Sequence, residues 1–314
     1  MRELSIGSND AGQRLDKYLH KYLKEATNGF IYKMLRKKNI VLNDTKADGK
    51  EIISEGDSVK LWLSEETIEK FRGTDNPDSH GPGGAYASWD EVPSLKTDEI
   101  VYEDKDILVI DKPAGELSQK AKPSDISINE RMLSYMYKTG DWDPLGTFTP
   151  GVCNRLDRNT SGLILAGKTL PGTRLLNEGI KNRSIKKYYI AIAQGDISEK
   201  IGSEWTRFDA YYKKNNDENI AFVFDEPGAD RESISTVFRL IDVYDTGDGD
   251  KWSKLEVWLI TGKSHQIRAF LAHLGHPLVG DSKYGSSSSG SYYLRAYKVE
   301  FENYNDHMTI CIDT

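Results

Sequence analysis

The spacing of apolar residues near the N-terminus is mainly helical. Apolar side chains recur every three or four positions over two short segments, and Asn28 can cap the second of them. Two later segments are short and apolar, and a polar turn separates them. This pattern predicts a small α+β unit within residues 1–63, with helices at 14–23 and 29–37 and strands at 40–42 and 59–63.

After residue 98 the pattern changes to alternating or continuous apolar runs, which are typical of strands. The predicted strands are 107–110, 162–166, 188–193, 220–224, 233–240, 255–260 and 296–301, with a hairpin tip at 245–251. Helical spacing is less frequent and predicts helices at 128–137, 170–182 and 265–274. Many strands and few helices favour an α+β fold with a large mixed, mainly antiparallel β-sheet and flanking helices.

The segment between these two parts, 64–97, shows no sustained period. It is rich in Gly, Pro, Ser and acidic residues, which is typical of a flexible linker. The sequence therefore predicts three units: a small N-terminal domain at 1–63, a flexible acidic linker at 64–97 and a large domain at 98–314.

The formal net charge of −7 disfavours nucleic-acid binding at first sight, because Lys and Arg dominate phosphate binding. The charges are unevenly distributed, however. Residues 14–38 hold eight basic and two acidic residues, whereas 64–100 holds nine acidic and three basic residues. The first of these segments is a candidate nucleic-acid-binding surface. Its basic residues are Arg14, Lys17, Lys21, Lys24, Lys33, Arg36, Lys37 and Lys38.

Composition also excludes several classes of protein. No run of about 18 apolar residues occurs, and the N-terminus lacks a charged start followed by an apolar stretch, so we expect neither a membrane span nor a secretory signal. Cys153 and Cys311 are too far apart to suggest a metal site, and His273 and His276 lack further ligands at suitable spacing. We therefore expect a cytoplasmic protein without a bound metal.

The densest group of candidate catalytic residues lies in 150–169, where Arg155-Leu156-Asp157-Arg158 precedes a loop-type Asn-Thr-Ser-Gly string and an apolar strand. Arginines beside Asp157 would favour its charged form, which suits a nucleophile or a base. The alternative is a surface turn with an ordinary Arg–Asp pair, and composition alone does not choose between the two.

Two later segments place polar residues next to predicted strands. Tyr188 and Tyr189 are adjacent in one strand and should point to opposite faces, so one can lie in the core and the other in a cleft; a purely structural strand is the alternative. In 259–285 a strand is followed by Lys263 and Arg268, and this arginine can pair with a carboxylate inside a site.

Taken together, these segments resemble the RluA family of pseudouridine synthases. NRLDRNTSG is similar to the family signature H-R-L-D-x-x-[ST]-S-G, KYYIA to K-x-Y-x-A, and TGKSHQIR followed by HLGHPLVGD to its third motif. The piece VYEDKDILVIDKPAGELSQ at 100–119 is also similar, and the resemblance covers 98–314. The basic N-terminal unit is similar to the small RNA-binding domain first seen in ribosomal protein S-four.

The resemblance implies roles for individual residues. Asp157 would be the catalytic aspartate, Tyr189 the active-site tyrosine and Arg268 the arginine that pairs with the aspartate. Asn154 stands where the family has histidine, which we expect to affect substrate contacts more than chemistry. Residues expected to contact the substrate are Asn154, Arg155, Leu156, Lys187 and Lys263. Residues expected to bind RNA through the N-terminal domain are Arg14, Lys17, Lys21, Lys33, Arg36, Lys37 and Lys38.

The implied activity is the conversion of uridine to pseudouridine in RNA without a cofactor, by a chain that we expect to be a monomer. Large-subunit ribosomal RNA is the first expectation for the substrate, and transfer RNA is the second. Whether Asp157 attacks the sugar or moves a proton stays open. The sequence leaves two alternative functions: a non-catalytic RNA-binding factor for ribosome assembly, and a glycoside hydrolase. The hydrolase would need a second carboxylate about 5–10 Å away, and the motifs supply only the distant Asp281.

Overall fold

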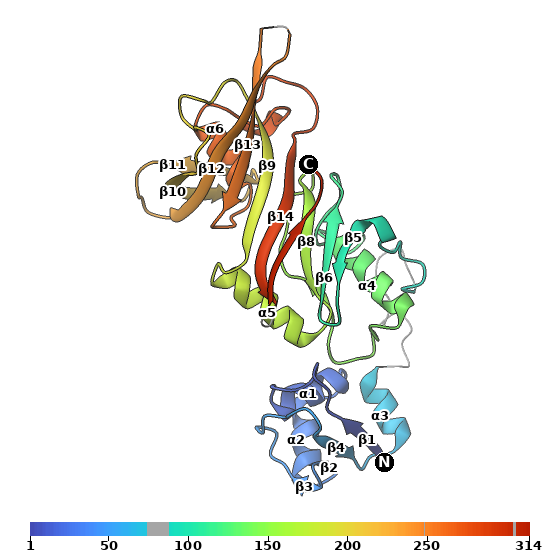
Figure 1. The fold of residues 1–314 in the computed structure, drawn as a ribbon. Coiled ribbons are helices and arrows are strands. Elements are labelled where there is room, and N and C mark those ends of the chain that lie inside the picture. Colours follow the sequence, from blue (N-terminus) through green and yellow to red (C-terminus); the bar gives the residue numbers. More distant parts are fainter. Residues whose placement is uncertain (74–87, 248, 304–305) are drawn as a thin grey trace.

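The computed structural model describes residues 1–73, 88–247, 249–303 and 306–314 (Figure 1). It shows a small N-terminal domain and a large domain built on one long sheet. The two domains are linked by polar contacts: the Asn9 side chain accepts a hydrogen bond from the Leu170 backbone, and Lys24 Nζ donates to the Pro144 carbonyl at 3.3 Å. No helix among the described residues has the length and apolar character needed to cross a membrane.

The N-terminal domain has a four-stranded sheet in the order β1-β4-β2-β3, and three helices cover it. Its core is formed mainly by the apolar faces of the helices, as their spacing predicts. One detail was wrong, because Thr27 rather than Asn28 caps the second helix, its side chain accepting a hydrogen bond from the Phe30 backbone. The elements are β1 (Arg2–Ser5), α1 (Leu15–Tyr22), α2 (Asn28–Arg36), β2 (Ile40–Leu42), β3 (Thr45–Lys46), β4 (Ser58–Leu61) and α3 (Glu65–Arg72).

The prediction of a flexible linker at 64–97 is wrong for its described parts. Residues 65–72 form α3, which is capped by Ser64 and buries Ile68 in the N-terminal core. Toward the other end of the segment, apolar side chains including Trp89 pack into the core of the large domain. Low average hydropathy hid these few apolar side chains, which are buried in the cores of the two domains. Residues 74–87, also in the predicted linker, lie outside the described residues.

The large domain has one mixed sheet of eleven strands in the order β11-β10-β12-β13-β9-β14-β8-β6-β5, with β15 paired to β14 and β7 paired to β8. Most pairs are antiparallel, and β14 with β8 is parallel. The predicted α+β class with a large, mainly antiparallel sheet is confirmed. The strands are β5 (Ile100–Glu103), β6 (Ile107–Lys112), β7 (Gly151–Val152), β8 (Ser161–Gly167), β9 (Lys186–Gln194), β10 (Thr206–Asn215), β11 (Ile220–Phe224), β12 (Glu232–Asp245), β13 (Lys251–Leu259), β14 (Leu294–Asn303) and β15 (Asp306–Cys311).

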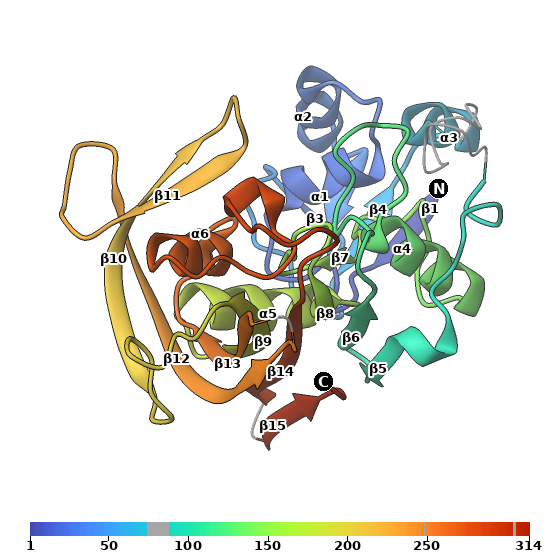
Figure 2. The same ribbon diagram turned by 90° about the horizontal axis from the view of Figure 1, so that it is seen from above.

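Helices cover both faces of this sheet. The helices are α4 (Ile128–Thr139), α5 (Leu170–Lys181) and α6 (Gln266–His273), with short 3-10 turns at Thr97–Glu99 and Ser282–Tyr284. Alternate residues of β6 and β8 point to opposite faces: Leu108 and Ile164 pack in the cluster that includes α4 and α6, whereas Val109 and Leu165 pack with Leu176 of α5. Figure 2 shows the strands from β10 to β14 curving around α6. This concave face holds the cleft described below.

Gly162 lets β14 approach β8 closely. Its φ is +112°, and a Cβ atom placed there would lie 2.1 Å from the Ala296 carbonyl oxygen. Only glycine avoids this collision with backbone, and it also adopts the positive φ without strain. Because β8 follows the loop that carries Asp157, this close approach helps to position the loop over the sheet.

Candidate active site

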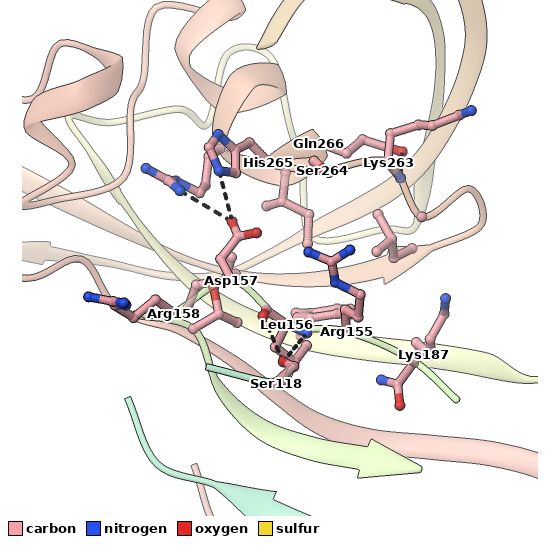
Figure 3. A pocket seen from close by; sticks show the side chains of 18 of the residues that line it. Ser118, Arg155, Leu156, Asp157, Arg158, Lys187, Lys263, Ser264, His265 and Gln266 are labelled. Carbon is pink, nitrogen blue, oxygen red and sulfur yellow. Dashed lines mark hydrogen bonds and ion pairs between the residues drawn. The ribbon is translucent and has the colours of Figure 1, made fainter. Parts of the chain in front are cut away.

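A cavity of about 870 Å³ opens on the concave face of the sheet. Residues from the three sequence motifs line it together: the loop before β8, the start of β9, and the segment between β13 and α6. Asp157, Tyr189 and Arg268, which lie up to 111 residues apart in the chain, meet here. Figure 3 shows the Asp157 carboxylate at the centre of this group of side chains.

The loop that carries Asp157 is held by a buried serine and a buried leucine. Ser118 Oγ donates a hydrogen bond to the Leu156 carbonyl at 2.8 Å and accepts one from the Leu156 amide at 2.9 Å. The Leu156 side chain is buried in the core, and the Thr160 amide donates to the Asp157 carbonyl at 3.0 Å. These contacts fix both sides of Asp157. Leu156 thus anchors the loop, whereas the sequence suggested a substrate contact, and Ser118 was not singled out.

Lys112 ties the same loop to the end of β6. Its side chain is fully buried, and Nζ donates to the carbonyl oxygens of Pro113, Glu116 and Arg158 at 2.8–3.0 Å. Burial lowers the pKa of this lysine to about 8, opposed by the charges of Glu116, Asp157 and Asp111. The role of Lys112 is therefore to join two loops through their backbones.

The Lys112 pKa predicts how stability changes with pH. Because the pKa is about 8 in the folded protein and 10.5 is the ordinary value, the unfolded chain binds more protons between these pH values. The free energy of unfolding of the wild type should therefore rise with pH relative to that of Lys112→Met. Urea unfolding of both proteins at about pH 8 and pH 9.5 measures this difference. A difference that stays constant or falls over this range would contradict the burial of a charged ammonium.

Arg268 joins two carboxylates inside the cleft. Its Nη1 donates to Asp157 Oδ2 at 3.2 Å, while Nε and Nη2 donate to the two oxygens of Asp281 at 2.7 and 2.9 Å. The rings of Tyr292 and Tyr284 lie 4.4 and 5.0 Å from its guanidinium carbon. Arg268 and Asp281 are both buried, so the bidentate pair fixes the direction in which Nη1 points. The sequence suggested that Asp281 lies far from Asp157, but in the structure it binds Arg268, which in turn contacts Asp157.

The neighbouring arginines do not pair with Asp157 as the sequence suggested. Neither Arg155 nor Arg158 forms an ion pair with a carboxylate of the described residues, and both side chains are exposed. Figure 3 shows the Arg158 side chain extending away from the Asp157 carboxylate. Successive residues of an extended loop point in different directions, so proximity in sequence does not bring their charges together.

Tyr189 lies in the cleft, and Tyr188 points to the other face, where it donates to Glu300. The Tyr189 side chain is 5% exposed. Burial, followed by the nearby charge of Asp157, raises the pKa of its phenol well above the ordinary value. The phenol therefore stays protonated at neutral pH.

The other residues that were expected to contact the substrate have different roles in the structure. Asn154 Nδ2 donates to the Leu163 carbonyl and its Oδ1 accepts from the Leu165 amide, so both polar atoms of its side chain bind the backbone of β8. Lys263 lines the cleft, and its Nζ pairs with Glu232. Lys187 also lines the cleft, and burial lowers its pKa. Of these residues, Lys187 remains a candidate for a substrate contact, whereas Asn154 has a structural role.

Within the described residues, no group of three or more His, Cys, Asp or Glu side chains is arranged to hold a metal ion. His273 pairs with Asp225 at 2.8 Å, and His276 Nδ1 contacts the Gln194 carbonyl at 2.9 Å. Both histidines therefore have protein partners at a helix end and a loop. His265, in contrast, lies in the cleft itself with Nε2 3.9 Å from Asp157 Oδ2. The sequence did not assign it a role, although it belongs to the third motif.

Comparison with known proteins identifies the family. The family model described as RNA pseudouridylate synthase matches residues 106–273. An RNA pseudouridine synthase of Mycoplasma genitalium, described as uncharacterized, is 31% identical over 281 residues, which span 89% of this chain and 80% of the relative. A ribosomal large subunit pseudouridine synthase C of Rickettsia felis is 29% identical over 277 residues, spanning 87% of this chain and 82% of the relative.

A solved structure shares the fold. The protein named human RNA pseudouridylate synthase domain containing 1 superposes with a TM-score of 0.55 at 21% identity, covering 70% of this chain and 86% of that chain. The matched segment contains Asp157, Tyr189 and Arg268, which the fold brings into one cleft. The chain belongs to the RNA pseudouridylate synthase family.

Proposed function

We propose that Asp157 is the reacting carboxylate of this pseudouridine synthase and that its substrate is a uridine of large-subunit ribosomal RNA. One observation supports the assignment of Asp157 as the reacting carboxylate. Arg268 holds Asp157 Oδ2, whereas Oδ1 has no hydrogen-bond partner among the described residues and lies in a cavity of about 870 Å³. A carboxylate with one fixed and one available oxygen, held in an open cleft, is arranged to meet a sugar carbon or a sugar proton.

The reaction needs no net input of atoms. The bond between the ribose C1′ and the uracil N1 breaks, the base turns, and a bond forms between C1′ and C5. The proton lost from C5 is balanced by one gained at N1. Asp157 either attacks C1′ or removes a sugar proton, and both routes use an ionised carboxylate. Arg268 Nη1 places a positive charge 3.2 Å from Oδ2 of this carboxylate.

Tyr189 and Arg155 are suited to binding of the nucleotide more than to proton transfer. The raised pKa of Tyr189 leaves its phenol protonated, so stacking against the uracil suits it better than action as a base. The base of a structured RNA has to leave its helix to reach this depth, and a buried aromatic ring lowers the free energy of the extruded base. Arg155 is exposed at the edge of the cavity, where its charge can meet a phosphate.

The N-terminal domain is proposed to bind RNA. All of its basic residues named above are exposed except Arg14, which pairs with Asp16 at 2.7 Å. The exposed residues lie on or just after α1 and α2, and the domain as a whole resembles one that binds RNA. Together with the relatives described as ribosomal large subunit synthases, this supports a large structured RNA as the substrate. Monomeric action is part of the same proposal.

Neutralising the basic residues at the end of α2 should weaken RNA binding without slowing catalysis. We change Lys33, Arg36, Lys37 and Lys38 together to Gln. We expect the magnitude of the slope of log affinity against log salt concentration to fall by about 3, because a protein with fewer phosphate contacts releases fewer counterions when it binds. Its single-turnover rate at saturating RNA should equal that of the wild type. Lys50→Gln, an exposed lysine of the same domain, is the matched control. An unchanged salt slope would remove this surface from the RNA interface.

The substrate is tested by mapping pseudouridines in total RNA from a strain that lacks the gene. The proposal expects at least one missing pseudouridine in large-subunit ribosomal RNA, restored by the wild-type gene and not by Asp157→Asn. Loss of a pseudouridine only in transfer RNA would assign the enzyme to the alternative substrate. Complete retention of every pseudouridine would reject both.

A further inference from the structure

His265 is held in an unusual conformation next to Asp157. It lies between β13 and α6 with φ +57° and ψ +15°, in the left-handed region that residues other than glycine rarely adopt. Its side chain is only 10% exposed. A strained backbone that places a buried polar ring in a cleft indicates a role for that ring, because the surrounding structure has to offset the strain.

The contacts of the ring determine which nitrogen carries its proton. His265 Nδ1 lies 2.9 Å from the Tyr284 hydroxyl, and that hydroxyl already accepts a hydrogen bond from the Ala221 amide at 2.9 Å. The hydroxyl proton then has Nδ1 as its acceptor among the described residues. We therefore assign Nδ1 as the acceptor and Nε2 as the N–H nitrogen of a neutral imidazole.

The Nε2 nitrogen of this tautomer lies near the same carboxylate oxygen that Arg268 holds. Nε2 lies 3.9 Å from Asp157 Oδ2, and Arg268 Nη1 lies 3.2 Å from it (Figure 3). The histidine distance is longer than a hydrogen bond, so in this open cleft the contact is between a dipole and a charge. A movement of about 1 Å would convert it into a hydrogen bond, and such bonds often tighten when a substrate binds.

Burial is the main reason why the His265 ring is neutral. Burial lowers its pKa, and the cations Arg268, Lys283 and Lys214 act in the same direction, while Asp157 acts against them. A neutral ring adds a donor without adding a second full charge next to Arg268. Asp157 thus receives one ionic contact and one dipolar contact on Oδ2, and neither contact occupies Oδ1.

We infer that His265 is a positioning residue, which together with Arg268 holds Oδ2 of Asp157 so that Oδ1 faces the uridine, and that Tyr284 selects the required tautomer. The inference rests on the assignment of Asp157 as the reacting carboxylate. It concerns orientation within the cleft, so its effect belongs to the chemical step and not to RNA affinity.

Two substitutions of His265 distinguish the effect of losing the N–H donor near Nε2 from an effect on folding. Asparagine tolerates the left-handed region well and can still accept from Tyr284 near the place of Nδ1, but it has no donor near the place of Nε2. Glutamine reaches that place with its amide N–H. We expect His265→Asn to slow single-turnover pseudouridine formation by about 10- to 100-fold with RNA affinity within about threefold of wild type. His265→Gln should recover most of the rate.

Tyr284→Phe provides an independent variant. Without the hydroxyl, the proton can move to Nδ1, and Nε2 then turns a lone pair toward the carboxylate. We expect this variant to lose rate to about the same extent as His265→Asn, and the double variant to lose little more than either single one, because both remove the same contact. Thermal unfolding of all variants confirms that each is folded under the assay conditions.

Several results would overturn the inference. A wild-type rate in His265→Asn would show that the donor is not needed, and equal losses in His265→Asn and His265→Gln would assign the ring a packing role. An affinity loss that accounts for the whole rate change would make His265 a substrate contact. Activity of Asp157→Asn, in contrast, would reject the proposed role of Asp157, so the two failures are distinguishable.

Discussion

Asp157→Asn should lower the single-turnover rate of pseudouridine formation by at least about 10⁴-fold, because an amide oxygen is neither a useful nucleophile nor a useful base. Asparagine has almost the same shape, and its oxygen can still accept from Arg268, which now holds Oδ2 at 3.2 Å. The variant should therefore fold normally and bind RNA within about threefold of the wild type. Single-turnover assays with saturating enzyme and equilibrium binding measure the two quantities separately.

The matched control is Asp209→Asn, which makes the same chemical change at an exposed carboxylate on β10. It should leave both rate and affinity unchanged. If Asp157→Asn forms pseudouridine at the rate of this control, Asp157 is not the reacting group. A loss of RNA binding equal to the loss of rate would instead make Asp157 a binding residue.

The second large effect is expected on replacing Arg268. Arg268→Met leaves Asp281, which is 2% exposed, without an ion-pair partner among the described residues. Removing one partner of a buried ion pair should lower the free energy of unfolding by about 3–5 kcal/mol. The reaction rate should also fall, because Asp157 loses the contact that holds Oδ2. Denaturant unfolding measures the free energy of unfolding, and single-turnover assays measure the reaction rate.

The double variant Arg268→Met with Asp281→Val separates stability from catalysis. Replacing both members of a buried pair by apolar residues is often close to neutral, so most of the lost stability should return. The rate should not return, because Asp157 still lacks its partner. A stable double variant with wild-type activity would show that Arg268 serves only the fold. If the double variant is no more stable than Arg268→Met, then the buried Asp281 charge is not the source of the destabilisation.

Local patterns predicted much of the fold. Period-two alternation in the sequence indicated most long strands, because a strand buried on one or both faces shows its register in its own residues. Helical spacing located the described α-helices except α3 to within a few residues, because a helix with one buried face also shows its period in its own residues. The predicted linker failed where Ile68 and Trp89 are buried, since one or two apolar side chains in a polar segment leave no periodic signal.

The resemblance predicted that Asp157 pairs with Arg268, and the structure shows this pair, whereas the local charge pattern around Asp157 and the position of Asp281 were misjudged. Arg155 and Arg158 flank Asp157 in the chain, and yet the charge that reaches its carboxylate comes from Arg268. Asp281 was set aside as distant, although it fixes the direction of Arg268. Lys112, Ser118 and His265 act through backbone contacts or a ring tautomer, which no pattern of residue types encodes.

By itself, the sequence determined the strand pattern, the basic N-terminal helices and the residue types available for chemistry, because these depend on each residue and its near neighbours. Only the tertiary structure decided which charges meet. The parallel contact of β14 with β8, permitted by Gly162, and the turn into α6 bring three distant segments to one cleft. Electrostatic and hydrogen-bond energies depend on separations of a few ångströms between atoms, and the packing of the sheet sets those separations.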